Sequence, residues 1–93
     1  MSRQTIAFDV DGTLIVQIGE KEDTPRYDII AMFNHFERLG WDMVIWSGGG
    51  VDYATRWSQK LGLNARIEGK GSIKPAIAVD DEEVKLGIIN IRV

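Results

Sequence analysis

The chain has 93 residues, 44% of them hydrophobic and 27% charged, which is typical of one folded domain (residues 1–93) rather than of a disordered segment. The net charge of -3 at pH 7 argues against bulk electrostatic binding of a nucleic-acid backbone, and the lack of cysteine excludes disulfides and thiolate chemistry. No apolar run approaches the ~18 residues that a membrane helix needs, and the first residues do not resemble a signal peptide. We therefore expect a cytoplasmic protein with no membrane partner.

The first predicted element is a strand over residues 5–9, since the run Ile6-Ala7-Phe8 is typical of a strand buried on both faces. Asp9 follows at the carboxyl end of this strand, which is the edge of a parallel α/β sheet where ligands bind. Asp11 comes two residues later, so both carboxylates point the same way before Gly12 lets the chain turn. Two carboxylates so close repel each other unless a cation or a shared proton offsets their charge. Asp-Gly by itself is also a common turn signal.

The segment between the first and second strands lacks a helical period at its start. We expect an extended arm over residues 14–18 and a mobile polar tip over residues 19–23. Thr24 is predicted to be the N-cap of a helix with Pro25 at its first position. That helix is expected to end at Gly40.

The rest of the chain predicts a second helix and four further strands. The second helix is expected to begin with Asp52 as its N-cap, to run to Lys60 and to be closed by Gly62. Residues 69–75 are too short and too rich in glycine and proline to form a helix. The strands are predicted at residues 42–46, 65–68, 76–79 and 87–92.

Several strands end in residues that carry chemistry. Asp9 ends the first strand, Ser47 the second, Lys70 follows the third and Asp80-Asp81 the fourth. If the strands are parallel, all of these groups meet at one edge of the sheet. A hydroxyl, an ammonium and several carboxylates together suit a phosphoryl group held with Mg²⁺, which binds carboxylate oxygens.

Two features next to these residues have more than one interpretation. Gly48, Gly49 and Gly50 follow Ser47 and precede a helix, an arrangement that can bring backbone amides close to a phosphate. A glycine triplet is more often a simple loop. The acidic run at residues 80–83 could likewise be the solvated start of a helix, where acids interact favourably with the helix dipole.

Taken together, these patterns resemble the haloacid dehalogenase-like (HAD-like) superfamily, most of whose members are phosphatases. The stretch Phe8-Asp9-Val10-Asp11-Gly12-Thr13-Leu14 is similar to the family's first motif almost letter for letter. Val44-Ile45-Trp46-Ser47 resembles the second motif, and Ala78-Val79-Asp80-Asp81 the double-acid form of the fourth. The resemblance implies a small, Rossmann-like α/β fold of two or three layers, with a parallel sheet in the strand order 3-2-1-4-5.

The resemblance also implies a role for each matching residue. Asp9 would be the nucleophile that forms an aspartyl-phosphate, and Asp11 would act as the general acid and base. Ser47 would donate a hydrogen bond to a phosphoryl oxygen, and Gly12 and Gly48 would line the substrate site. The function implied is that of a Mg²⁺-dependent phosphomonoester hydrolase.

The Mg²⁺ ligands implied by the resemblance are the side chain of Asp9, the carbonyl of Asp11 and one of Asp80 or Asp81. Which of these two binds directly stays open. The cation would let the acids coexist and would neutralise charge on the phosphoryl oxygens.

The family's third motif is a lysine, and the chain offers two candidates. Lys74-Pro75 matches the Lys-Pro sequence that the family often has in this motif, but it lies before the fourth strand, at the edge of the sheet opposite Asp80. Six residues of strand, at ~3.3 Å each, would separate the two by roughly 20 Å. Lys70 follows the third strand directly, at the edge where Asp9 lies. We therefore expect Lys70 to be the catalytic lysine.

No cap domain is present in either of the positions where family members insert one. We therefore expect an open site that admits a phosphorylated small molecule, the end of a nucleotide or a macromolecule. Two alternatives from other classes stay open: a HAD-like module that binds or assembles without catalysis, and a signalling domain with a stable phosphoaspartate.

Both helices of the expected fold lie on one face of the sheet. The connector at residues 69–75 must then cross the other face nearly extended, because seven residues reach at most ~23–25 Å. It would leave apolar side chains such as Trp46 and Ala78 uncovered. An exposed apolar patch usually marks an interface, so we hypothesise a homodimer that packs these faces together.

Overall fold

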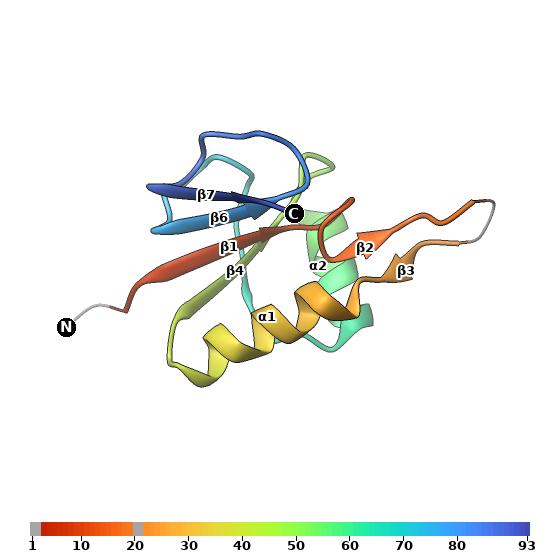
Figure 1. Cartoon of the computed structure of the whole chain (residues 1–93), viewed down its shortest axis with the longest axis horizontal. Helices are drawn as coiled ribbons and strands as arrows, with labels where there is room; N and C mark the ends of the chain where they lie inside the picture. Colours follow the sequence, from red (N-terminus) through yellow and green to blue (C-terminus); the bar gives the residue numbers. More distant parts are fainter. Residues whose placement is uncertain (1–2, 20–21) are drawn as a thin grey trace.

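Five short strands form the parallel sheet at the centre of the computed structural model, which describes residues 3–19 and 22–93 (Figure 1). Two helices and a two-stranded hairpin complete the elements of this described part. The sheet contains β1 (Thr5–Asp9), β4 (Asp42–Trp46), β5 (Arg66–Ile67), β6 (Ile77–Asp80) and β7 (Ile89–Arg92). The helices are α1 (Tyr27–Arg38) and α2 (Val51–Leu61), and the hairpin pairs β2 (Ile15–Val16) with β3 (Thr24–Pro25). The predicted α/β class is confirmed.

The strands lie side by side in the order β5-β4-β1-β6-β7, and every neighbouring pair is parallel. The predicted order 3-2-1-4-5 numbered only five strands and placed none between the first two strands of the sheet. In the structure, β2 and β3 lie between them in the chain and pair in a separate antiparallel sheet. The observed order is therefore written with different strand numbers from the predicted one. Because all five strands run the same way, their carboxyl ends share one edge, and the β2–β3 hairpin projects beyond it (Figure 1).

Alternate residues of the central strands point to the two helices and form the larger core. Ile6 and Phe8 of β1 and Ile45 of β4 are fully buried there. The ring of Phe33 from α1 lies 5.3 Å from that of Phe8, measured between centroids, and Ala54 contributes from α2. Both helices therefore cover the same face, as the right-handed crossover rule requires.

The opposite face is covered as well, so the expectation of a bare face is wrong. Ile73 from the 69–75 connector and Leu86 from the loop between β6 and β7 pack against it. The connector is not extended throughout, since the amide of Ser72 donates to the carbonyl of Gly69 in a turn. The loop at residues 81–88 supplies the rest. Its last two residues were predicted to belong to the fifth strand, which begins only at Ile89, and no helix starts at the acidic run 80–83. The side chains that the connector and this loop bury, none more than 1% exposed, are Ala7, Val44, Trp46 and Ala78.

This packing removes the reason for the homodimer hypothesis. The hypothesis required an apolar sheet face left open by a single chain. Within one chain, Trp46 is already fully buried on that face.

Two helix starts differ from the prediction. Thr24 and Pro25 form β3 instead of the first turn of α1, and the N-cap is Arg26 in an extended conformation. The amide of Arg26 donates to the carbonyl of Leu14, so pairing with the first half of the hairpin keeps this segment extended. The N-cap of α2 is Gly50, not the predicted Asp52.

Other ends agree with the prediction. Gly62 closes α2 in a left-handed conformation with φ of 68°. The tip predicted at residues 19–23 lies partly outside the described residues. Neither helix has the length and apolar character that crossing a bilayer would require, as far as the described residues go.

The tight passage of the 81–88 loop past β6 leads to a stability prediction. A Cβ on Gly87 would lie 2.9 Å from the backbone nitrogen of Ala78 and 3.0 Å from the carbonyl oxygen of Ile89. Neither backbone atom can move without disturbing the pairing of β6 with β7. We expect Gly87→Ala to lower the free energy of unfolding by about 1–3 kcal/mol in urea denaturation.

Gly48→Ala is the matched control, because a Cβ added at Gly48 would have no atom within 4 Å. Its unfolding free energy should stay within about 0.5 kcal/mol of the wild type. Equal stability of the two variants would contradict the close packing of this loop.

Candidate active site

Residues from the carboxyl ends of β1, β4 and β6 meet in a pocket of about 380 Å³. Lys70, from the loop after β5, also lines this pocket. Most of the residues predicted for the site are therefore brought together by the fold. The pocket is lined by Asp9, Asp11, Gly12, Gly48, Gly49, Lys70, Asp80, Asp81 and Glu82.

Lys70 is the positive centre of this pocket. Its Nζ donates a hydrogen bond to Oδ1 of Asp9 at 3.0 Å and lies 2.8 Å from Oδ2 of Asp80. Lys74 is exposed and stands next to the amino edge of the sheet, where the amide of Ala76 donates to the carbonyl of Thr5. Lys70 thus lies where strand geometry predicted it, and Lys74 does not reach the site.

The carboxylates outnumber this ammonium, and two of them are nearly inaccessible. Asp9 is 5% exposed and Asp80 2% exposed. Burial raises the pKa of Asp9 to about 6; the hydrogen bond from Lys70 opposes this rise, and the charges of Asp80 and Asp81 add to it. Burial, followed by the neighbouring Asp80, also raises the pKa of Asp81. For Lys70, the carboxylates of Asp80 and Asp9 outweigh the effect of burial, so its pKa is raised.

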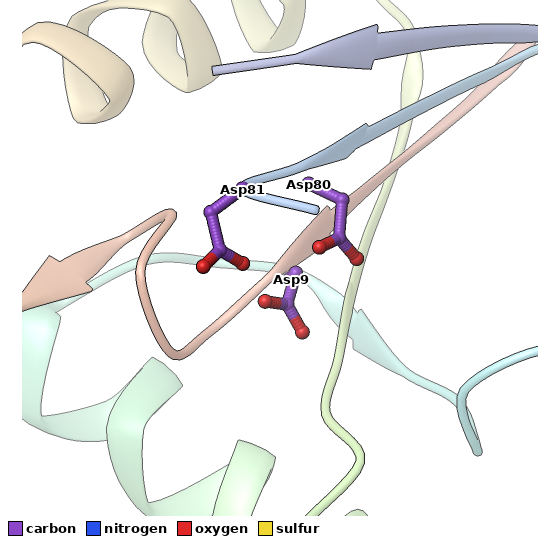
Figure 2. A group of neighbouring side chains, drawn as sticks. All are labelled: Asp9, Asp80 and Asp81. Atoms are coloured by element: carbon purple, nitrogen blue, oxygen red, sulfur yellow. The ribbon is translucent and has the colours of Figure 1, made fainter. Parts of the chain in front are cut away.

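The geometry of three carboxylates fits a small divalent cation. Asp9, Asp80 and Asp81 lie side by side at the ends of β1 and β6 (Figure 2), each with an oxygen within 4.8 Å of the others. Ligands of an octahedral Mg²⁺ are about 3 Å apart when adjacent and about 4.2 Å apart when opposite, so these oxygens would have to draw together around the ion. Buried Oδ2 of Asp80 already lies 2.8 Å from the ammonium of Lys70. The three carboxylates still exceed this one ammonium, and such an excess of negative charge favours a further cation.

The side chain of Asp11 is not part of this carboxylate cluster. It is exposed, and its Oδ1 accepts a 2.6 Å hydrogen bond from the hydroxyl of Tyr53 on α2. This bond to the carboxylate raises the pKa of Tyr53. The metal role implied for Asp11 concerned its backbone carbonyl, which this side-chain contact leaves unaffected.

Two side chains at the site were missed by the sequence analysis. Tyr53 occupies the first turn of α2, directly after the glycine loop, and that position was a signal that could have been used. Thr13 is fully buried and its Oγ1 lies 3.5 Å from Oδ2 of Asp9 as a weak donor. Its place two residues after Asp11 in the first motif was the corresponding signal.

Ser47 lies at the end of β4 and is 4% exposed. Its Oγ accepts a hydrogen bond from the amide of Gly49 at 3.0 Å, and its carbonyl accepts one from the amide of Gly50. The loop is therefore a tight turn that holds Gly48 and Gly49 at the pocket. Because Oγ acts as an acceptor in this turn, its hydroxyl proton is free to donate.

Gly12 combines a special backbone conformation with a lack of space. Its φ is 79°, and a Cβ there would lie 2.2 Å from Oδ2 of Asp81. The guanidinium of Arg26 also donates to the carbonyl of Gly12 at 3.1 Å. Only glycine lets this turn pass so close to the acid after β6.

A second pocket of similar volume, about 400 Å³, lies at the amino edge of the sheet. Its Arg66 pairs with Asp42 at 2.6 Å and with Glu68 at 2.8 Å. These ion pairs balance the charge of Arg66 within the chain, whereas the pocket at the carboxyl edge has more carboxylates than ammonium groups.

No family model, curated protein or solved structure matches the chain. The assignment of a function therefore depends on the residues and their geometry. What distinguishes the carboxyl-edge pocket is a buried Asp9 between an ammonium and two further carboxylates.

The close contact at Gly12 can be tested directly. We expect Gly12→Ala to push Asp81 aside and to weaken Mg²⁺ binding by about 10- to 100-fold, as loss of a supporting contact does at other metal sites. Isothermal titration calorimetry measures the affinity.

Gly62→Ala separates this effect from backbone strain. Gly62 has a similar φ of 68° but no atom within 4 Å of a Cβ. Both variants should lose about 1–2 kcal/mol of stability from the left-handed conformation, and Gly62→Ala should bind Mg²⁺ like the wild type. The same affinity in both variants would refute a role of Gly12 in Mg²⁺ binding by the carboxylate cluster.

Proposed function

We propose that this protein is a Mg²⁺-dependent phosphomonoester hydrolase that acts through an aspartyl-phosphate in an open site. One observation carries the proposal: the buried carboxylate of Asp9 ends the central strand, bonded to Lys70 and beside Asp80 and Asp81. The resemblance of the motifs around these residues to the HAD-like superfamily supports it. The proposed partner is a phosphorylated substrate.

In the first step, an oxygen of Asp9 attacks phosphorus, and the bond from phosphorus to the ester oxygen breaks. Asp11 gives its proton to the departing oxygen. In the second step, Asp11 takes a proton from water, whose oxygen attacks phosphorus and releases Asp9 and inorganic phosphate. Lys70 holds the Asp9 carboxylate in place and offsets part of its charge during both steps.

The groups after β4 would hold the phosphoryl oxygens. The hydroxyl of Ser47 keeps a free proton to donate, and the backbone of Gly48 lines the pocket beside it. Donors fixed in this way stabilise charge that develops in the transition state. Gly12 also lines the pocket, but its amide donates to the carbonyl of Ile15 and is not one of these donors.

Asp9 and one of Asp80 or Asp81, together with the carbonyl of Asp11, would hold Mg²⁺. When bound, the cation supplies positive charge that offsets both the phosphoryl oxygens and the clustered acids. The excess of three clustered carboxylates over the single ammonium of Lys70 supports this assignment.

The segments between the motifs support an open site. Between β1 and α1 the chain forms the β2–β3 hairpin, and between β4 and β5 it forms α2. Neither insertion has the size of a domain that could enclose a substrate. We keep the cytoplasm as the proposed compartment, since a chain without cysteine needs no oxidising environment to fold.

Asp9→Asn tests the nucleophile. The amide keeps the shape of the side chain but cannot attack phosphorus, so Mg²⁺-dependent turnover of p-nitrophenyl phosphate should fall below a few per cent of wild type. Because the variant removes one of several buried like charges, the metal-free protein should unfold at the same temperature or higher.

Asp52→Asn serves as the control, since Asp52 is an exposed acid in the first turn of α2. It should keep both activity and stability. If Asp9→Asn retains substantial turnover, Asp9 is not the nucleophile. A wild type with no turnover at all would favour a binding module, and a long-lived phosphorylated form would favour a signalling domain.

The two lysines provide the second test. Lys70→Ala removes the ammonium that contacts Asp9 and Asp80, and kcat should fall at least 100-fold, in the range found for other charge-stabilising groups. Lys74→Ala alters an exposed residue at the other edge and should leave kcat within about twofold. Steady-state kinetics with p-nitrophenyl phosphate compares them. The reverse order of effects would show that Lys74, not Lys70, serves the reaction.

A further inference from the structure

One face of α2 forms a second hollow beside the proposed active site. Tyr53, Arg56, Trp57 and Lys60 line a pocket of about 290 Å³. Their spacing of three, four and seven residues from Tyr53 places them on the same side of the helix. We call this set of four residues the α2 pocket.

The α2 pocket is linked to the active site through Tyr53, which lines the α2 pocket and bonds to Asp11 of the acidic pocket. The hydroxyl of Tyr53 donates to Asp11, the residue proposed to protonate the departing oxygen. A substrate whose phosphoryl group lies at Asp9 must direct its leaving group past Asp11. The leaving group would therefore pass Tyr53 and lie against α2.

The chemistry of the α2 pocket differs from that of the acidic site. Trp57 is half-buried, and Nζ of the exposed Lys60 lies over its ring, 4.8 Å from the centroid. Arg56 is exposed beside them. A flat ring attached to a negative group suits this arrangement, because the flexible side chain of Lys60 can leave the ring face to the base and pair with the negative group.

A neighbouring hollow limits how far such a ligand can extend. Trp57 and Lys60 also line a space of about 370 Å³ with Glu22 and Asp23 from the hairpin side. These carboxylates would repel further phosphates on that side. The net charge of -3 likewise disfavours a long nucleic acid.

We propose that the α2 pocket binds the leaving group of a nucleotide that carries a second phosphate, such as a nucleoside bisphosphate. The base stacks on Trp57 beside Tyr53, and Arg56 and Lys60 contact the second phosphate. This inference rests on the proposed function, because it places the scissile phosphate at Asp9. The bond from that phosphorus to the sugar oxygen breaks, and the oxygen leaves with the proton of Asp11.

Binding, rather than turnover, tests the pocket. The inactive Asp9→Asn variant is titrated by calorimetry in Mg²⁺ with adenosine 3′,5′-bisphosphate, adenosine 5′-monophosphate and ribose 5-phosphate. The base should strengthen binding by about 5- to 100-fold, the range for stacking of one base on an aromatic side chain. The second phosphate should add about threefold or more.

Four further substitutions in the same background, one of them a control, assign these gains to residues. Trp57→Leu should remove the gain from the base, and Trp57→Phe should restore most of it. Arg56→Ala alters an exposed residue and should remove most of the gain from the second phosphate. Arg38→Ala, at the exposed end of α1, is the matched control and should change neither.

The outcomes separate this inference from the proposed function. Equal affinities for the three ligands, or gains that survive both Trp57→Leu and Arg56→Ala, would overturn the nucleotide pocket, even if the wild type hydrolyses p-nitrophenyl phosphate. A phosphotyrosine peptide that binds more tightly than the bisphosphate would also overturn it. If affinity rises from ribose 5-phosphate to the monophosphate to the bisphosphate, but the wild type hydrolyses no phosphate ester, the nucleotide pocket is upheld and the phosphatase proposal is refuted.

Discussion

The contact of one ammonium with two buried carboxylates organises the carboxyl edge of the central sheet. Lys70 reaches from the loop after β5, past the end of β4, to Asp9 on β1 and Asp80 on β6. The same connector then places Ile73 against the second face of the sheet, where Trp46 is buried. A single crossing segment therefore offsets charge at the site and closes part of the core.

Negative charge still exceeds positive charge at this edge, and this excess is the basis of the proposed metal and phosphoryl chemistry. Burial raises the pKa of Asp9 to about 6 despite the bond from Lys70. Asp81 is added close by because Gly12 leaves room for it. A site arranged only for stability would have replaced some of these acids, since unpaired buried charge is costly. A bound divalent cation would offset this excess negative charge, and a phosphoryl group bound beside it would be the target of Asp9.

The glycine loop after β4 connects this chemistry to a surface that could choose a substrate. Because α2 begins at Val51, directly after Gly50, its first turn brings Tyr53 to Asp11. The other residues on this face of α2, Arg56, Trp57 and Lys60, extend from Tyr53 away from the carboxylate cluster. One hydrogen bond thus joins the proposed catalytic groups at the strand ends to the proposed recognition surface on the next helix.

The sequence by itself determined the strands β1 and β4 and the meeting of Asp9 with Lys70. An apolar run bounded by charge identifies a buried strand, and parallel strands bring their carboxyl ends to one edge. Only the tertiary structure decided that Thr24 belongs to a hairpin and that Trp46 is covered. The first depends on pairing with residues eight positions or more away, which outweighs a local helix-start signal. The second depends on how two irregular loops pack, and no periodicity in the sequence encodes such packing.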